Sequence, residues 1–175
     1  DPDTTALMLT QTGGGCRASN YIHLLRKALK GKYPQVPVIS LNFSGLEKEG
    51  GFHLTVPIIM KLLFAVLYGD LLMLLYNQCR PYEMIPGDTD KVLHQWEKTL
   101  QENFLKNKFL GTAKTYKKIL DDFAKIKRSK IKKIKVGIVG EIYVKYSPLA
   151  NNHLEDFLIS EGCETVMPSL LDFVL

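Results

Sequence analysis

The chain has 175 residues, of which 46% are apolar and 23% charged. These values fit one globular domain, or at most two small ones, and they exclude wholesale disorder and collagen-like repeats. The formal net charge is +5, but residues 114–135 hold ten basic and two acidic side chains, a local charge of +8. The rest of the chain is therefore slightly acidic, so a charge-led contact would involve this one segment.

The N-terminal part alternates between strand and helix patterns. Residues 5–10 form an apolar run that predicts a buried strand, which enters a glycine-rich turn at residues 11–16. The helical spacing of Tyr21, Leu24, Leu25, Ala28 and Leu29 predicts a helix over residues 17–30. Residues 36–41 predict a second buried strand, and a polar loop follows.

An apolar stretch over residues 56–76 is long enough to suggest a membrane span. It contains Pro57, Lys61, Gly69 and Asp70, and a charge at the middle of a span costs roughly 2.5–3.5 kcal/mol. We therefore expect no membrane span. The better interpretation is one buried helix, or two helices broken near Gly69.

Two amphipathic helices are predicted next. Pro86 to Thr89 indicate a turn and a helix cap, and the helix that follows has an apolar stripe through Trp96 and Leu100. After Gly111 the second helix has its lysines outward. The side chains expected inward are Tyr116, Ile119, Leu120, Phe123 and Ile126.

Residues 134–140 are the clearest strand pattern in the chain. After it we predict a helix from about Asn151 or Asn152 to Glu161, a strand over residues 164–167 and a helix capped by Ser169. This alternation predicts an α/β fold, specifically a Rossmann-like open parallel sheet with a helical insertion at about residues 55–128. We expect residues 1–175 to form a single lobe cut from a longer chain.

Ligands of open α/β sheets bind beyond the carboxyl ends of the strands, where two loops qualify. In the first, Gly13, Gly14 and Gly15 allow close backbone approach, and the helix behind them could cradle a phosphate or lower the pKa of Cys16. A tight turn with an inert thiol is an equally good interpretation. The loop matches neither a dinucleotide fingerprint nor a Walker A loop.

The second loop covers residues 140–152. Glu141 and Tyr143 could form the polar rim of a substrate site; alternatively Glu141 is only exposed and Asn151 or Asn152 caps a helix. For Arg80 and Glu83 three alternatives are open: the two side chains pair with each other, they contact a partner subunit, or they lie in a solvated turn. The four histidines have no zinc-site spacing, and three sparse cysteines fit a reducing cytoplasm.

Four segments of the chain resemble one family: TQTGGGCRASNY (10–21), VISLNFSGLEK (38–48), YGDLLMLLYNQCRPYE (68–83) and VGIVGEIYVKYSPLANN (136–152). They are similar to the 2-hydroxyacyl-CoA dehydratase-like proteins fused to, or paired with, an ATP-driven activase. Such proteins are often labelled activators of 2-hydroxyglutaryl-CoA dehydratase. The resemblance covers nearly the whole chain in the expected order.

The resemblance implies a Rossmann-like part that bears an iron–sulfur cluster and receives one low-potential electron for acyl-CoA dehydration or reduction. ATP is used only on the activase part. Cys16 matches the position of a cluster ligand. Only this ligand role is carried over from the resemblance. From the two loops at the strand ends, we predict as cofactor-binding residues Gly13, Gly14, Gly15, Arg17, Glu141 and Tyr143.

One ligand cannot hold a cluster. The resemblance places the other cluster cysteines in a segment before Asp1, so we expect the cluster in the full-length parent and no activity from this fragment alone. The expected partners are an activase domain or subunit, and either a second copy or a dehydratase partner subunit, in the cytoplasm and without nucleic acid. The alternative is a non-catalytic module that docks an activase or partner subunit.

Overall fold

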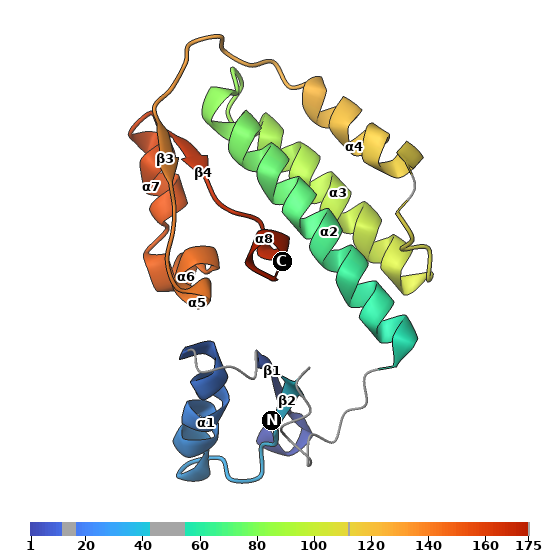
Figure 1. The fold of residues 1–175 in the computed structure, drawn as a ribbon, viewed down its shortest axis with the longest axis vertical. Helices are drawn as coiled ribbons and strands as arrows, with labels where there is room; N and C mark the ends of the chain where they lie inside the picture. Colours follow the sequence, from blue (N-terminus) through green and yellow to red (C-terminus); the bar gives the residue numbers. More distant parts are fainter. Residues whose placement is uncertain (12–16, 43–54, 112, 175) are drawn as a thin grey trace. The chain divides into compact units, whose positions relative to one another are not determined.

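The computed structural model describes residues 1–11, 17–42, 55–111 and 113–174 (Figure 1). The chain divides into two compact units. The first comprises Asp1–Thr55 and Glu141–Tyr143, and the second comprises Val56–Gly140 and Val144–Leu175. Each unit is described by itself.

The first unit contains a parallel strand pair and one long helix. After a short 3-10 helix, η1 (Pro2–Thr4), the strand β1 (Leu7–Gln11) pairs with β2 (Val38–Asn42), and the helix α1 (Arg17–Lys30) connects them. The bounds of α1 are those predicted. Its inner face differs, because Ile22 is fully buried whereas Leu24 is 60% exposed.

The second unit is built on three helices: α2 (Val56–Cys79), α3 (Asp88–Leu105) and α4 (Ala113–Ala124). The short 3-10 helix η2 (Arg80–Tyr82) follows α2, and α3 runs back beside it (Figure 1). α2 is continuous through Gly69, so of the two alternatives that the sequence left open, the single helix is present and the break is not. The sequence correctly placed the helical segment, and the exposed lysines of α4 confirm its outward face.

The hydrophobic core of this unit lies between helices. Its buried members are Tyr68, Leu72, Cys79, Trp96, Leu100, Ile119, Phe123 and Ile126. The rings of Tyr68 and Tyr116 stack with centroids 5.2 Å apart, which joins α2 to α4. Leu120 was predicted to face inward but is 47% exposed. Each fully buried large apolar side chain contributes about 1.5–3 kcal/mol, so this helical core dominates the stability of the unit.

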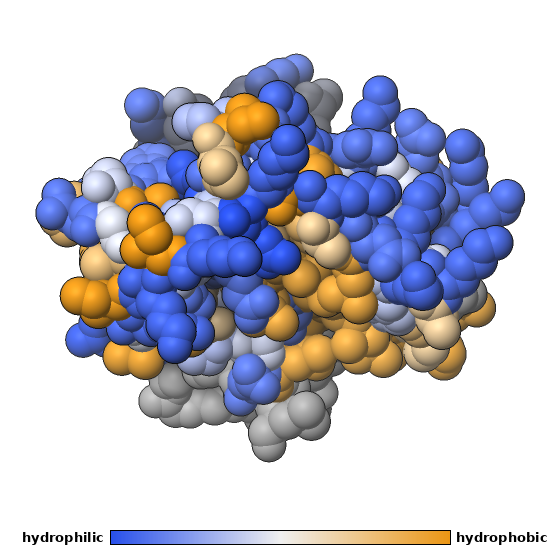
Figure 2. All heavy atoms as spheres, turned by 90° about the horizontal axis from the view of Figure 1, so that it is seen from above, coloured by the Kyte–Doolittle hydropathy of each residue, from blue (hydrophilic) through white to orange (hydrophobic). Residues whose placement is uncertain are grey.

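The first half of α2 carries much of its apolar surface outside this core. Val56 is 73% exposed and Leu63 is 44% exposed. Figure 2 shows orange hydrophobic side chains lying open beside blue hydrophilic ones on the face that it draws. The segment Val56–Tyr82 is long and apolar enough to cross a membrane, with a mean hydropathy of 2.2 and 11% of its most apolar window buried. One such helix is weak evidence for a membrane span.

The rest of the second unit is a small α/β part. The strands β3 (Lys135–Gly137) and β4 (Glu164–Val166) pair in parallel, from Lys135 opposite Glu164 to Gly137 opposite Val166. Between them lie α5 (Ile142–Tyr146), whose first two residues belong to the first unit, α6 (Pro148–Asn151) and α7 (Leu154–Ser160). The helix α8 (Leu170–Val174) follows β4.

The helix ends in this part show how local side chains set boundaries. Asn152 and His153 both have positive φ, which ends α6 at Asn151 and separates it from α7. The helix predicted from Asn151 or Asn152 to Glu161 corresponds to α7, which begins slightly later, at Leu154. Asn151 accepts a hydrogen bond from the backbone of Leu154 at 3.1 Å, which confirms its role at a helix start. The hydroxyl of Ser169 accepts from Asp172, so the predicted cap of the last helix is also confirmed.

The predicted Rossmann-like open sheet is wrong. The described residues contain only two separate parallel pairs, β1–β2 and β3–β4, and most of these residues are helical. The seven-residue apolar pattern at residues 134–140 yields a strand of only three residues. The helical segment between the strand patterns is therefore no insertion in a sheet; it forms the main hydrophobic core.

Candidate functional site

The first predicted loop lies largely outside the described residues. Gly13, Gly14, Gly15 and Cys16 all fall there, so the structure says nothing of them. Arg17 is described: it is the first residue of α1, and its side chain is exposed.

The second predicted loop contributes Glu141 and Tyr143 to the first unit. The Tyr143 ring meets the Tyr21 ring of α1 edge to face, with centroids 6.2 Å apart. The half-buried Glu141 accepts a hydrogen bond from the Tyr143 backbone at 3.0 Å through Oε2. The structure thus brings Tyr143 onto the helix that begins at Arg17.

A second group of polar side chains lies on α2 and on the segment that follows it, and the first of these is Asp70 in the middle of the helix. Its two carboxylate oxygens accept hydrogen bonds from the backbone of Leu170 at 2.8 Å and of Leu171 at 3.0 Å. A carboxylate at the start of a helix satisfies backbone donors and interacts favourably with the helix dipole. Asp70 therefore holds α8 against α2, and this contact explains a charge in the middle of an apolar helix.

Arg80 joins η2 to α7. Its guanidinium forms an ion pair with Asp156 at 2.5 Å and lies 5.3 Å from the centre of the Tyr76 ring. The hydrogen bond from Arg80 holds the pKa of Asp156 below its usual range. The sequence left Glu83, a partner subunit or solvent open as the surroundings of Arg80, whereas in the structure its partner lies 76 residues away along the chain.

Tyr82 and Glu164 connect η2 to β4. The Tyr82 hydroxyl donates to Glu164 at 2.6 Å and accepts from the backbone of Lys133 at 3.3 Å. Lys135 pairs with the other oxygen of Glu164 at 3.0 Å. Burial raises the pKa of this carboxyl, but the hydrogen bonds from Tyr82 and Lys135 outweigh burial and lower it. Glu164 is thus a buried, satisfied anion.

Glu83 caps α3 from outside the helix. Its carboxylate accepts from the backbone of Gly87 and of Thr89, both at 2.8 Å. Gly87, the N-cap residue, has a φ of 87°, which favours glycine, and makes no side-chain cap. Burial raises the pKa of Glu83, but these hydrogen bonds outweigh it and lower the pKa. The predicted turn and cap are present, with the capping group supplied by Glu83.

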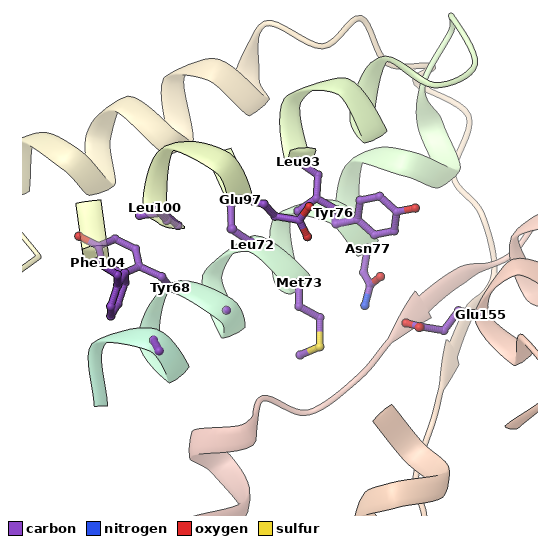
Figure 3. Close-up of a pocket in the computed structure, with 12 residues that line it drawn as sticks. Tyr68, Leu72, Met73, Tyr76, Asn77, Leu93, Glu97, Leu100, Phe104 and Glu155 are labelled. Atoms are coloured by element: carbon purple, nitrogen blue, oxygen red, sulfur yellow. The ribbon is translucent and has the colours of Figure 1, made fainter. Parts of the chain in front are cut away.

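A groove of about 450 Å³ lies between α2, α3 and α7 (Figure 3). Its walls are mainly apolar, with Tyr76, Asn77, Glu97 and Glu155 as polar members. Burial raises the pKa of Glu155, although a hydrogen bond from Asn77 opposes the shift. Burial and the hydrogen bond to Asp90 likewise raise the pKa of Tyr76. The groove favours neutral groups over anions.

A second cleft, of about 470 Å³, lies where the segment after α4 passes η2 and β4. We call it the basic cleft. Its lining residues are Gln78, Tyr82, Arg128, Ser129, Lys130, Ile131, Lys132, Lys135 and Glu164. Its four cationic side chains all belong to residues 114–135, the basic segment that the charge distribution of the sequence had indicated.

The two described cysteines do not form a metal centre. Cys79 is buried in the helical core, and burial raises the pKa of its thiol, although Arg128 donates to Sγ at 3.7 Å and opposes the shift. Cys163 is partly exposed in the turn after α7. Within the described ranges, no three His, Cys, Asp or Glu side chains are grouped to hold a metal ion.

Sequence reasoning missed the acidic partners Asp156 and Glu164 and the polar pair Asn77 and Glu155. Each lies far along the chain from the group that it contacts, so no local spacing could reveal the pairing. The signal that the sequence did carry was the polar content of the segment 77–83 at the end of an apolar helix.

Comparisons with protein-family models, with curated proteins and with solved structures give no match for this chain.

Proposed function

We propose that this chain is part of an activase-linked protein of the 2-hydroxyacyl-CoA dehydratase-like family. In this proposal it belongs to the part that bears the iron–sulfur cluster and serves ATP-driven, low-potential electron transfer to an acyl-CoA in the cytoplasm. The observation that carries the proposal is the resemblance of four long segments in the expected order. ATP is bound and hydrolysed by the activase part, which is a separate domain or subunit.

The contacts of the motif residues support this proposal. In the segment that ends with Arg80, Pro81, Tyr82 and Glu83, every polar side chain of these four has a defined partner in the second unit. A motif whose side chains fix the ends of α3, α7 and β4 has a physical reason to recur within a family that shares this arrangement.

The first unit adds a second line of support. Tyr143 meets α1 through Tyr21, and α1 begins immediately after Cys16. The proposed surroundings of the cofactor, including Arg17 and Glu141, thus belong to one compact unit.

The described residues do not fit an iron–sulfur cluster by themselves. A cluster is held by several thiolates, whereas Cys79 is buried with a raised pKa and lies in the helical core. We therefore place Cys16 as one ligand and expect the other thiolates from another part of the full-length protein or from a second copy.

Anaerobic reconstitution of the full-length protein with iron and sulfide tests the proposal. We expect Cys16→Ala to lower the iron and sulfide bound per chain, and Cys163→Ala, the matched control, to leave both unchanged. Unchanged cluster content in Cys16→Ala would remove the ligand assignment.

The exposed lysines of α4 favour a second candidate, a docking module for an activase or partner subunit. Lys114 and Lys118 are exposed on the outer face of this helix. A charge-led contact weakens as salt rises, because ions screen exposed charges. Pull-down with the activase should therefore fall with salt and with Lys114→Glu/Lys118→Glu, but not with the control Lys27→Glu/Lys30→Glu on α1. Binding that survives both changes would exclude docking through this face.

A further inference from the structure

The basic cleft has a charge that its own unit does not neutralise. Of its four cations, Lys135 pairs with Glu164. Arg128, Lys130 and Lys132 form no ion pair with a carboxylate in the described part of the chain. Other basic side chains nearby do find one, as Lys125 does with Asp122 at 2.7 Å and Lys117 with Asp121 at 2.9 Å.

The backbone that carries these cations is anchored. Met84 donates to the carbonyl of Lys127 at 2.9 Å, and Ser129 donates to the carbonyl of Tyr82 at 2.8 Å. These bonds flank an antiparallel bridge between Glu83 and Arg128. The segment is thus fixed against η2, so a ligand would meet cations whose backbone is already in place, which lowers the entropic cost of binding.

Arg128 is held further by its contact with Cys79. Its Nη1 lies 3.7 Å from Sγ, and burial raises the pKa of that thiol, so the contact does not neutralise the guanidinium. A guanidinium has five donors in a planar fork. Those that Cys79 does not occupy can serve a bidentate acceptor.

Among the described residues that line the cleft, the one carboxylate, Glu164, already has partners. Glu164 has 7% side-chain exposure and accepts from both Tyr82 and Lys135. Its negative charge is therefore offset locally and does not repel an anion that approaches the other three cations. The net charge presented by the cleft is positive.

We propose that the basic cleft binds a multiply charged phosphate group of the diphosphate class, through Arg128, Lys130 and Lys132. Guanidinium and ammonium groups together match phosphate oxygens in charge and in donor geometry. A diphosphate carries about as many negative charges as these three side chains carry positive ones, and a hollow of about 470 Å³ is within the range of small-molecule sites. The inference is independent of the proposed function, because it uses no residue of the predicted cofactor site.

A small phosphate ligand explains the cleft better than a nucleic acid does. Proteins that bind single strands without sequence preference stack successive bases on aromatic side chains. Tyr82 is the single aromatic residue lining the cleft, and its hydroxyl is engaged by Glu164 and Lys133.

Calorimetric titration of the full chain with inorganic pyrophosphate, in low-salt buffer with EDTA, tests the proposal. We expect Arg128→Gln/Lys130→Gln/Lys132→Gln to bind pyrophosphate about tenfold more weakly or worse, since the variant loses three charge-assisted contacts to phosphate oxygens. The matched control is Lys98→Gln/Lys108→Gln/Lys114→Gln, which removes three exposed lysines elsewhere in the same unit. It should change the affinity less than about twofold, because distant exposed charges are screened.

A single substitution tests whether the loss of affinity could come from misfolding. Lys130 is exposed and its side chain forms no hydrogen bond or ion pair with the described residues, so Lys130→Glu should fold as the wild type does and still lose pyrophosphate affinity about threefold or more, through charge reversal. Its thermal unfolding midpoint supplies the folding control.

Further titrations with ADP and with adenosine show whether the diphosphate that binds is free or part of a nucleotide. Tighter binding of ADP than of pyrophosphate, with none of adenosine, identifies a nucleotide-like ligand; equal binding identifies a free diphosphate. The proposal is overturned if wild type does not bind pyrophosphate, if both triple variants lose affinity equally, or if a single-stranded oligonucleotide binds while pyrophosphate does not.

Discussion

The groove on α2 and α3 and the basic cleft are close in size but opposite in chemistry. The groove, at about 450 Å³, has apolar helical walls and two glutamates, whereas the cleft, at about 470 Å³, has four cations on a segment without helical structure. Side chains of the groove are part of the hydrophobic core. In the cleft, by contrast, Arg128, Lys130 and Lys132 are exposed, so they can change at little cost to stability. We therefore expect the groove to be required for folding and the basic cleft to be available for binding.

The largest expected difference comes from truncating one apolar side chain of each hollow. Leu72 lines the groove and is 6% exposed, so Leu72→Ala should lower the free energy of unfolding by about 2–5 kcal/mol. Ile131 lines the cleft and is 75% exposed, so Ile131→Ala should change it by less than about 0.5 kcal/mol. Urea unfolding followed by the fluorescence of Trp96, the one tryptophan, reports on this unit. Similar costs for both variants would refute the distinction.

Glu83 contacts an element of each hollow. Its carboxylate caps α3, which forms a wall of the groove, and its backbone forms an antiparallel bridge with Arg128, which lines the basic cleft. Glu83→Gln should cost about 1–2 kcal/mol at neutral pH, in the range of a lost helix cap. The folded-state pKa of Glu83 is lowered, so this stabilisation is complete above the unfolded value of about 4.5 and is lost as the pH falls through the folded value. Unfolding measured from pH 7 to pH 3 should show the two proteins converging in acid; a constant difference would argue against the ionic cap.

Glu155 in the groove should behave in the opposite direction. Burial raises its folded-state pKa, so the stability that it contributes is complete below the unfolded pKa and is lost as the pH rises through the folded one. Glu155→Gln mimics the neutral form and should be slightly more stable than wild type at pH 8. The gain should be smaller than the loss for Glu83→Gln and should vanish at low pH. A loss at pH 8 would mean that the carboxylate has a partner stronger than Asn77.

The smallest expected effect on stability is that of Lys130→Gln in the basic cleft. An exposed lysine without a carboxylate partner in the described structure should change the free energy of unfolding by less than about 0.5 kcal/mol. The same variant should still weaken pyrophosphate binding in the titration described above. A marked loss of stability would show that the cleft is a structural element.

The sequence predicted most helices well, because each carries its signal within a few turns. α1 begins and ends where its apolar spacing indicates, and α4 is marked by the alternation of Ile119 and Phe123 with lysines. The lengths of the strands were harder to predict, since a short apolar run has the same sequence pattern whether it pairs over three residues or over seven. The run at residues 134–140 pairs only along β3.

The polar contacts of the second unit could not be predicted from the sequence for a different reason. Arg80, Tyr82 and Glu83 were recognised as a polar turn, but their partners are set by tertiary packing. For Glu83 a pair with Arg80, a partner subunit and a solvated turn were left open, whereas its carboxylate caps the next helix through two backbone donors. The cofactor loop at residues 13–16 lies outside the described residues, so its role stays a prediction.

The long-range contacts of α2 have a consequence for synthesis of the chain. Asp70 is satisfied by residues about 100 positions later, and Tyr82 by a residue 82 positions later. On the ribosome, α3 and α4 can pack on α2 early, but the part of α2 that meets β4 and α8 stays uncovered while roughly a hundred more residues are translated, which takes about 5–20 s at ordinary elongation rates. During that interval its apolar surface is open to chaperones and to other nascent chains. We expect the yield of folded protein to depend on elongation speed and on chaperone supply.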